Sequence, residues 1–412
     1  MASALQEVQV HFTISPDQSQ PVGILASHGH RCFFEYNPEW LQRKLELSPF
    51  ILPLKSGLVE HKQMEFGPLF GLFDDSLPDG WGLLLMDRYF RGQGKNPATI
   101  SPLDRLLFLG TSTMGALTYH PAARPVSQGD APLDLHDLAR QSQEIFAGSE
   151  NEILPLLLHV GGSPGGARPK ALIGYNPVSR IIVVGHETIP PDFEPWIVKF
   201  SAREDVRDAG PVEYAYSRMA EAAGVLIPPT RLFRTDQGDA FFGVKRFDRG
   251  PVNRRYHIHT FGNLIQTNFR IPACDYADLF KVTSILTRNH RDLLQAFRLM
   301  LFNVLAHNRD DHAKNFSFIL DENTGQWALA PAYDLTFAHG PGGEHSCTVA
   351  GEGRAPGFKH FAQLAGQYDI SLKDMDAMIV EVAAAIKQWP KFADDAGVPE
   401  RTKRKIGDIL KK

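Results

Sequence analysis

Two side chains five positions apart, the carboxyl of Asp310 and the amide of Asn315, have the chemistry that phosphoryl transfer needs. A carboxylate can orient an attacking hydroxyl and accept its proton, and a nearby amide oxygen can hold a metal ion against phosphate groups. The surrounding segment, 307–316, reads His-Asn-Arg-Asp-Asp-His-Ala-Lys-Asn-Phe. These residue types at this spacing predict a phosphotransferase loop, with Asp310 as the base and Asn315 as a metal ligand.

The residues after this loop supply a second candidate metal ligand, Asp334. Residues 315–330 read as two strands around an Asp-Glu-Asn-Thr-Gly turn, so the chain returns to the loop before Tyr-Asp-Leu at 333–335. The order matches protein kinases, where His-Arg-Asp-x-x-x-x-Asn precedes a magnesium-binding aspartate, except that Asn308 separates the histidine from the arginine. A surface hairpin followed by a helix-capping aspartate is the alternative, which this ordered arrangement disfavours.

A glycine-rich segment at 160–170, Val-Gly-Gly-Ser-Pro-Gly-Gly-Ala-Arg-Pro-Lys, could bind phosphates. Glycines let backbone N–H groups approach phosphate oxygens closely, and the two cations add positive charge. The segment matches neither common phosphate-loop pattern, so taken alone it is better interpreted as a flexible surface loop. The candidate ATP-binding residues here are Gly161, Gly162, Ser163, Gly165, Gly166, Arg168 and Lys170.

Lys199 lies in an otherwise apolar strand-like run, Trp-Ile-Val-Lys-Phe, as does the lysine that pairs with ATP phosphates in protein kinases. Glu213, near the start of the next predicted helix, could be its ion-pair partner. The alternatives are an edge-strand lysine facing solvent and a glutamate favoured by the helix dipole. Further along, Lys245, Arg246 and Phe247 lie where a strand would enter a hinge between lobes, so their backbone could bind adenine.

The remaining polar residues of the loop are His307, His312, Lys314 and Asp311. Two histidines could bind a metal, but magnesium prefers oxygen ligands, so contacts with phosphate or with the structure suit His312 and Lys314 better. The chain has neither His-Glu-x-x-His nor paired cysteines, and zinc catalysis is therefore not expected. Asp311 is expected to take no part in the chemistry.

Composition sets the class of protein. The 412 residues are 43% hydrophobic, which predicts a globular protein of two or three domains. A net charge of −4 disfavours direct binding of nucleic acid, so any DNA contact is expected through a partner. Three scattered cysteines indicate neither disulfides nor zinc, and no apolar run reaches the length of a membrane span. We therefore expect a cytoplasmic protein without a membrane segment.

Periodicity divides the chain into three predicted domains. Residues 1–125 read as a β-rich module with a helix at 80–90, and 121–132 as a linker. Residues 126–248 alternate strand-like and helical runs in the order expected of an ATP-binding lobe, and 249–412 are mainly helical. The predicted strands are 171–173, 181–184, 196–200 and 240–244, and the predicted helices are 133–146, 211–223, 293–306 and 372–386.

Taken together, these motifs resemble the HipA family of serine/threonine kinase toxins. The resemblance rests on the glycine-rich segment at 160–170, Asn-Arg-Asp-Asp-His-Ala-Lys-Asn at 308–315 and Pro-Ala-Tyr-Asp-Leu at 331–335. It extends over nearly the whole chain, because Phe-Asp-Asp-Ser-Leu-Pro-Asp-Gly-Trp-Gly at 73–82 is similar to that family's N-terminal subdomain. It implies an α+β, protein-kinase-like two-lobe fold with an N-terminal β-rich subdomain, an ATP-binding lobe and an all-helical C-terminal domain.

The resemblance also implies roles for residues at matching positions. Asp310 would be the catalytic base, Asn315 and Asp334 the ligands of Mg²⁺, Lys199 the phosphate lysine, and residues 245–247 the adenine-side hinge of an ATP site. Members of the family phosphorylate a protein serine or threonine, in known cases on an aminoacyl-tRNA synthetase, and so stall translation and favour dormancy. They are held by a helix-turn-helix antitoxin that binds operator DNA.

One departure from the family concerns autophosphorylation. Members often modify a serine immediately before the Val-x-Gly of the glycine-rich segment, and here that position is His159. Ser163 is the only hydroxyl residue between Leu154 and Lys170, so we expect it to be the regulatory site. A phosphate there would compete with ATP for the same amides and cations.

Two other functions remain open from the sequence. A pseudokinase that only docks a partner would not need Asp310, Asn315, Asp334 and Lys199 together. A small-molecule kinase could use similar residues, but the N-terminal module resembling the toxin family argues against it.

Overall fold

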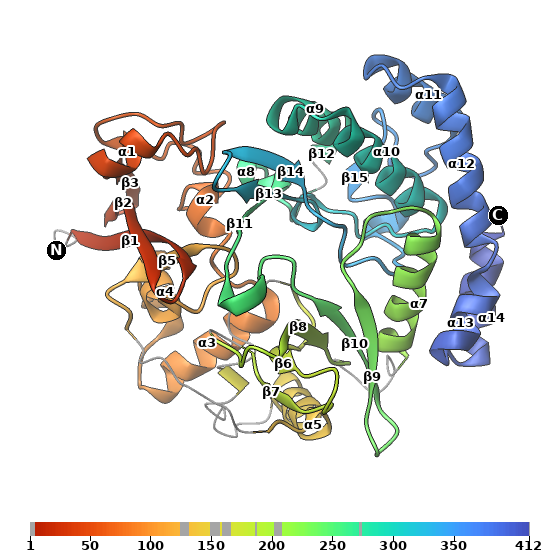
Figure 1. Cartoon of the computed structure of the whole chain (residues 1–412), viewed down its shortest axis with the longest axis horizontal. Coiled ribbons are helices and arrows are strands. Elements are labelled where there is room, and N and C mark those ends of the chain that lie inside the picture. Colours follow the sequence, from red (N-terminus) through yellow and green to blue (C-terminus); the bar gives the residue numbers. More distant parts are fainter. Residues whose placement is uncertain are drawn as a thin grey trace.

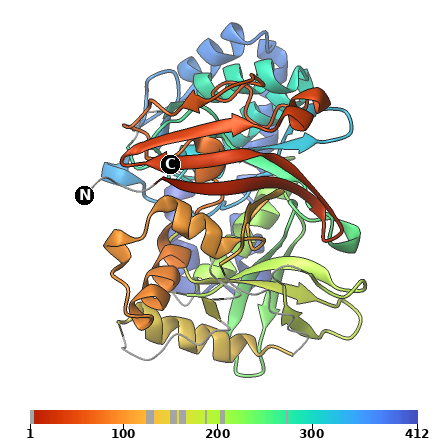
Figure 2. The same cartoon turned by 90° about the vertical axis from the view of Figure 1, so that its left-hand side faces the viewer.

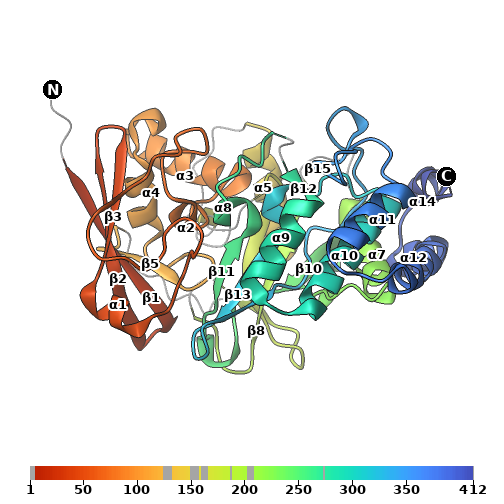
Figure 3. The same ribbon diagram turned by 90° about the horizontal axis from the view of Figure 1, so that it is seen from above.

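Three regions follow one another along the chain in the computed structural model, from the N-terminal sheet to the C-terminal helices (Figure 1). The structure describes residues 5–123, 132–148, 157–158, 166–185, 188–201, 208–271 and 274–411. Seen from above, the N-terminal sheet lies at one end of the molecule and helices α12 and α14 lie at the other (Figure 3). Within these residues, no helix is long and apolar enough to cross a bilayer.

The first region is an antiparallel five-stranded sheet in the order β4-β3-β2-β1-β5. Its first strand alternates cleanly, with Val8, Val10 and Phe12 buried and Glu7 and Gln9 exposed, so one face is apolar. The strands are β1 (Gln6–Ser15), β2 (Gln18–His28), β3 (Arg31–Tyr36), β4 (Val59–Glu60) and β5 (Leu117–His120). The helices of this region are α1 (Pro38–Arg43), α2 (Gly71–Asp74), α3 (Gly80–Gly92) and α4 (Pro102–Leu109).

The second region is another antiparallel sheet, in the order β7-β6-β8-β10-β9. Figure 2 shows it below the N-terminal sheet, with the orange and gold helices beside it. Lys170 lies opposite Lys199, which in turn lies opposite Phe242, so these three side chains share one face of the sheet. The elements are β6 (Lys170–Tyr175), β7 (Ile182–Val184), β8 (Glu194–Lys199), β9 (Thr230–Arg234), β10 (Ala240–Lys245), α5 (Leu135–Phe146) and α7 (Ala209–Ala222).

The third region is mainly helical around a small three-stranded sheet in the order β11-β13-β14. The strands are β11 (His257–Thr260), β13 (Ser317–Asp321) and β14 (Gln326–Leu329), and a two-stranded parallel pair is formed by β12 (Cys274–Asp275) and β15 (Cys347–Thr348). The helices are α8 (Phe261–Leu264), α9 (Tyr276–Thr287), α10 (His290–Leu305), α11 (Phe358–Gln367), α12 (Leu372–Ile386), α13 (Trp389–Ala396) and α14 (Glu400–Leu410), with a short 3₁₀ turn η4 (Ala313–Asn315).

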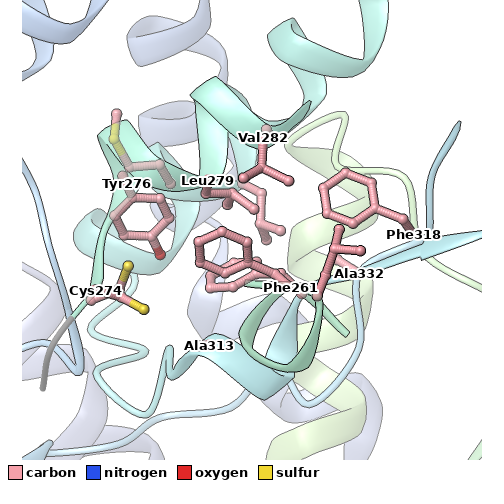
Figure 4. Close-up of a cluster of buried hydrophobic side chains, with 14 of the residues drawn as sticks. Phe261, Cys274, Tyr276, Leu279, Val282, Ala313, Phe318 and Ala332 are labelled. Carbon is pink, nitrogen blue, oxygen red and sulfur yellow. The ribbon is translucent and has the colours of Figure 1, made fainter. Parts of the chain in front are cut away.

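Two hydrophobic cores hold these regions together. The larger core is continuous from the N-terminal sheet through α7 to the C-terminal helices, and the smaller one lies between α3, α5 and the β6–β10 sheet. Figure 4 shows part of the larger core, where Phe261 and Phe318 gather against Leu279 and Val282 of α9, close to Ala313. The N-terminal sheet is therefore packed on the C-terminal region and does not stand apart from it.

The structure confirms the predicted strands and helices of the second and third regions within a few residues. The hairpin after residue 315 forms as predicted from β13 and β14, and it gains a third strand, β11, which the periodicity did not indicate. Most of the predicted linker at 121–132 lies outside the described residues. The three cysteines, Cys32, Cys274 and Cys347, are free and buried.

Close packing of α2 on α8 leads to a test by substitution. A Cβ on Gly71 would lie 1.9 Å from the carbonyl oxygen of Asn263, so we expect Gly71→Ala to destabilise the protein by about 2 kcal/mol through overpacking. Gly92, at the end of α3, has open space around the same position, and Gly92→Ala should raise stability by roughly 0.5 kcal/mol through helix propensity. Urea denaturation of both variants measures the difference, and equal effects would contradict the described packing.

Candidate active site

The loop that carries Asp310 is tied to the end of α10. The side chain of Asn308 is buried and donates from Nδ2 to Oδ1 of Asn303 at 2.9 Å, while its backbone N–H donates to the carbonyl of Asn303 at 2.9 Å. His307, just before it, has a positive φ of 53° and turns the chain out of the helix. The inserted Asn308 thus fastens the loop to the helix that precedes it.

Asp311 is a buried anchor for the same loop. Its carboxylate accepts hydrogen bonds from the Tyr276 hydroxyl at 2.8 Å, from Nδ1 of His345 at 2.9 Å and from the backbone N–H of Ser346 at 2.9 Å. Since the side chain of Asp311 is directed inward, the chain presents the neighbouring Asp310 at the exposed side. The expectation that Asp311 takes no part in the chemistry stays a prediction, and its contacts give it a structural role.

Asp310 and Asn315 lie at the two ends of this loop and contact each other. Nδ2 of Asn315 donates to the backbone carbonyl of Asp310 at 2.7 Å, so the amide oxygen of Asn315 is the atom that could bind a metal. Partial removal of water by the surrounding protein raises the pKa of the Asp310 carboxyl, and the carboxylate of Asp334 acts in the same direction while His312 opposes it. The pKa of Asp310 is therefore closer to that of a hydroxyl group than the pKa of an ordinary aspartate is.

Lys199 joins the sheet to both neighbouring regions. Its Nζ donates to Oε1 of Glu213, which is buried on α7, and to Oδ1 of Asp334, which follows β14. Burial opposes the charge of Lys199, but the two carboxylates outweigh it and raise its pKa. Burial likewise opposes the charge of Asp334, yet Lys199 and Lys170 lower its pKa well below the ordinary range. Lys199 and Asp334 are therefore both ionised at neutral pH.

The cations at the end of the glycine-rich segment lie beside this ion pair. Arg168 Nη1 is 3.5 Å from Oε2 of Glu213, and buried Lys170 shares the sheet face with Lys199. Burial lowers the pKa of Lys170, although Asp334 partly compensates. Gly166 has a φ of 94°, and a Cβ there would lie 2.6 Å from Nζ of Lys170, so glycine is required. Gly161, Gly162, Ser163 and Gly165 lie outside the described residues.

The predicted hinge residues point in different directions. Lys245 Nζ donates to Glu194 at 2.6 Å, and Arg246 forms a buried pair with Asp248, so neither side chain is directed at Lys199. The N–H of Lys245 donates to the Pro229 carbonyl and that of Arg246 to the Pro195 carbonyl, both at 2.9 Å.

Phe247 is the hinge residue whose side chain reaches the site. Its ring stacks on Tyr333 with centroids 5.8 Å apart and planes 30° apart. The Tyr333 hydroxyl donates to the carbonyl of Lys314 at 2.7 Å, which joins the residue before Asp334 to the loop of Asp310. An aromatic surface therefore adjoins the charged groups.

His312 and Lys314 lie on the side of the loop that faces the N-terminal region. Lys314 Nζ is 3.2 Å from Oδ2 of Asp74 and 4.8 Å from the centre of the Phe269 ring, and the His312 ring lies 5.4 Å from the same phenylalanine. Sequence reasoning did not identify Asp74 as a partner of the loop. The only signal was that it belongs to the Phe-Asp-Asp-Ser-Leu-Pro-Asp-Gly segment that contributed to the family resemblance.

The architecture is that of a two-lobed, protein-kinase-like fold, with the Lys199–Glu213 ion pair in one lobe and the Asp310 loop in the other. The HipA-like C-terminal domain matches residues 162–389, and the HipA N-terminal domain matches residues 17–120. The chain therefore belongs to the HipA family, as its motifs indicated.

Two relatives and one solved structure are also similar to this chain. "Putative kinase Y4mE" of Sinorhizobium fredii is 26% identical over 391 residues, covering 89% of this chain and 80% of the relative. "Putative kinase Y4dM" of the same organism is 29% identical over 154 residues, covering 34% of this chain and 36% of the relative. The fold matches a chain of the Shewanella oneidensis MR-1 complex of HipA, HipB and operator DNA with a TM-score of 0.71 and 17% identity, covering 98% of this chain and 95% of that one.

Two neighbouring aspartates allow a test of the anchor. Asp311→Ala leaves the Tyr276 hydroxyl and the His345 ring without their buried partner, so we expect a loss of about 3 kcal/mol in the free energy of unfolding. Asp310→Ala, at an exposed position one residue away, should cost less than about 1 kcal/mol. Urea denaturation gives both values. A small loss for Asp311→Ala would show that the buried network does not hold the loop.

Proposed function

We propose that this protein is an ATP- and Mg²⁺-dependent kinase that transfers a phosphoryl group to a serine or threonine of a protein. The observation that carries the proposal is the line of charges from Glu213 through Lys199 to Asp334, which lies in the same site as Asp310 and Asn315. The five groups come from four separate parts of the chain. Clusters of charged groups with shifted pKa values occur preferentially at functional sites, although desolvating them costs free energy.

Asp310 would act on the acceptor hydroxyl. Its carboxyl is exposed, so an incoming side chain can reach it, and its raised pKa makes it a better proton acceptor than an ordinary aspartate. The buried contacts of Asp311 hold the loop while the proton is transferred. Asp310 would thereby orient the hydroxyl and take its proton as the phosphoryl group moves.

Asn315 and Asp334 fit a magnesium ion. Both offer oxygen ligands, and the lowered pKa of Asp334 keeps its carboxylate charged. The ion, when bound, would neutralise charge that develops on the phosphates. Lys199 contacts Asp334 directly, so it would exchange this partner for phosphate oxygens while Glu213 keeps it in place.

The nucleotide would lie between the two lobes. The stacked rings of Phe247 and Tyr333 offer an apolar surface for adenine, while Gly166, Arg168 and Lys170 lie near Lys199 on the phosphate side. The N–H groups of residues 245 and 246 already donate within the protein, so adenine would contact other backbone groups of the hinge.

In the cell, we propose that this kinase is the toxin of a toxin–antitoxin pair in the bacterial cytoplasm. Support comes from membership of the HipA family and from the fold shared with a HipA that forms a complex with HipB and operator DNA. A net charge of −4 agrees with DNA contact through a helix-turn-helix antitoxin. The protein substrate would be a translation component such as an aminoacyl-tRNA synthetase.

Autophosphorylation at Ser163 is the proposed form of self-regulation. The residue lies outside the described part of the chain, and the proposal rests on its being the only hydroxyl between Leu154 and Lys170. Incubation with ATP and Mg²⁺ followed by phosphopeptide mapping should find phosphate on this serine. An unmodified glycine-rich segment would remove the proposal.

The decisive experiment compares wild-type protein with Asp310→Asn. Each is incubated with labelled ATP and Mg²⁺ in a lysate of the source cells, and labelled proteins are identified by mass. Loss of the general base should lower transfer by about 100-fold or more while ATP still binds. Asp321→Asn, an exposed aspartate at the end of β13, is the matched control and should label as wild type does.

The outcomes separate the competing functions. Label that appears on one protein and is lost with Asp310→Asn identifies a protein kinase and its substrate. If wild type binds ATP but labels no protein, the site serves a small-molecule acceptor or a pseudokinase, and the present proposal is wrong.

A further inference from the structure

Residues 74–81, from the last residue of α2 to the first two residues of α3, contact both sides of the proposed ATP site. We call these residues the bridging segment. Its first residues contact the region of the Asp310 loop, and its last residues contact the end of the glycine-rich segment. Asp79 follows Asp74 by five positions, and a fully extended chain over this distance spans at most roughly 18 Å. A short piece of backbone therefore sets the distance between two parts of the site.

The first end of the bridging segment is fixed to the C-terminal region. The carboxylate of Asp75 accepts from the backbone N–H of Thr260 at 2.8 Å and from its hydroxyl at 2.7 Å. The carboxylate of Asp74 accepts from Nδ2 of Asn263 at 3.0 Å and from Nζ of Lys314 at 3.2 Å. Lys314 is adjacent to the proposed metal ligand Asn315, so this end is held at the catalytic loop.

The other end is fixed to residues 166–170. The carboxylate of Asp79 accepts from the backbone N–H of Gly166, and the backbone N–H of Trp81 donates to the carbonyl of Gly166 at 3.1 Å. The indole of buried Trp81 donates to the carbonyl of Lys170 at 3.2 Å. Three hydrogen bonds therefore define where the glycine-rich segment enters β6.

The way α3 begins shows that these contacts replace ordinary helix capping. Asp79 is the N-cap residue, a position at which an aspartate usually accepts from N–H groups of its own helix. It makes no such bond here, and its carboxylate is directed to Gly166 instead. Gly80 follows with a φ of 46°, and a Cβ at that position would lie 2.6 Å from Cα of Ala167. Asp79 and Gly80 of the bridging segment thus both contact the glycine-rich segment.

We propose that Asp79 and Gly80 are positioning residues for ATP, an inference that rests on the proposed kinase function. By holding Gly166 and Lys170 at a fixed place relative to the Asp310 loop, they set the affinity of the site for the nucleotide phosphates. They contact no reacting atom themselves. The N-terminal region thereby contributes to nucleotide binding through residues that contact the glycine-rich segment.

The test measures ATP binding and the separate values of KM and kcat for full-length variants. Asp79→Ala removes the hydrogen-bond acceptor and should weaken ATP binding and raise KM for ATP by about tenfold, with a smaller change in kcat. Asp79→Asn keeps an acceptor oxygen and should stay within about threefold of wild type. In Gly80→Ala the added methyl group would clash with Ala167 and push it away. This variant should raise KM for ATP without removing any hydrogen-bonding group.

Asp104→Ala is the control for a purely structural effect. Asp104 lies in the same N-terminal region and caps α4 by accepting from the N–H of Ser101 at 2.9 Å, so its loss should lower the melting temperature. It makes no contact with residues 166–170 among those described, and KM for ATP should not change. Circular dichroism and thermal melting of each variant establish that it is folded.

The results distinguish this inference from the proposed function. If wild type binds ATP and folded Asp79→Ala and Gly80→Ala bind it equally well, the bridging segment does not position the nucleotide. If Asp79→Ala does not fold, Gly80→Ala decides on the same criterion, and Asp79→Asn serves as the variant expected to bind ATP nearly as wild type does. If wild type itself binds no ATP, the kinase proposal fails instead.

Discussion

The Lys199 ammonium lies between two carboxylates that come from different parts of the chain, Glu213 on α7 and Asp334 after β14. Because an unpaired charge in this partly buried place would be unstable, the sheet, the helix and the hairpin must all be in position together. The second sheet supplies the strand, the helix packs on that sheet, and the hairpin returns the chain to it. The architecture around the site follows from the need to bring these three charges together.

The opposite side of the site depends on hydrogen bonds instead of ion pairs. Asp311 gathers Tyr276, His345 and the backbone of Ser346 into a buried network, and Asn308 ties the same loop to α10. A buried network of this kind resists movement, because breaking one of its hydrogen bonds leaves a buried polar group unpaired. One side of the site is therefore fixed by charge and the other by hydrogen bonding.

Local patterns were enough to predict the hairpin and the helices, since polarity repeats along the sequence report which face is buried. The pairing of Lys199 with Glu213 was predicted from a likeness to the lysine–glutamate pair of protein kinases, and the structure contains that ion pair. Local patterns could not indicate that Asp311 is buried or that Arg246 pairs with Asp248, since a paired buried charge looks like a solvated one in sequence. The contact of Asp74 with Lys314 spans 240 positions and leaves no local signal. The domain boundaries at residues 125 and 248 stay a prediction.

The distribution of the two cores bears on how the halves of the molecule can move. The chain passes from one core to the other along the bridging segment, within α4 and again near the hinge. Within α4, for example, Leu106 belongs to the larger core and Phe108 to the smaller. Two bodies joined at one point can swing widely apart, whereas bodies joined along an edge can only slide by small amounts. Exchange of the proposed nucleotide should accordingly proceed by shear between packed elements, and the length of the shortest connection limits how far the two halves can separate.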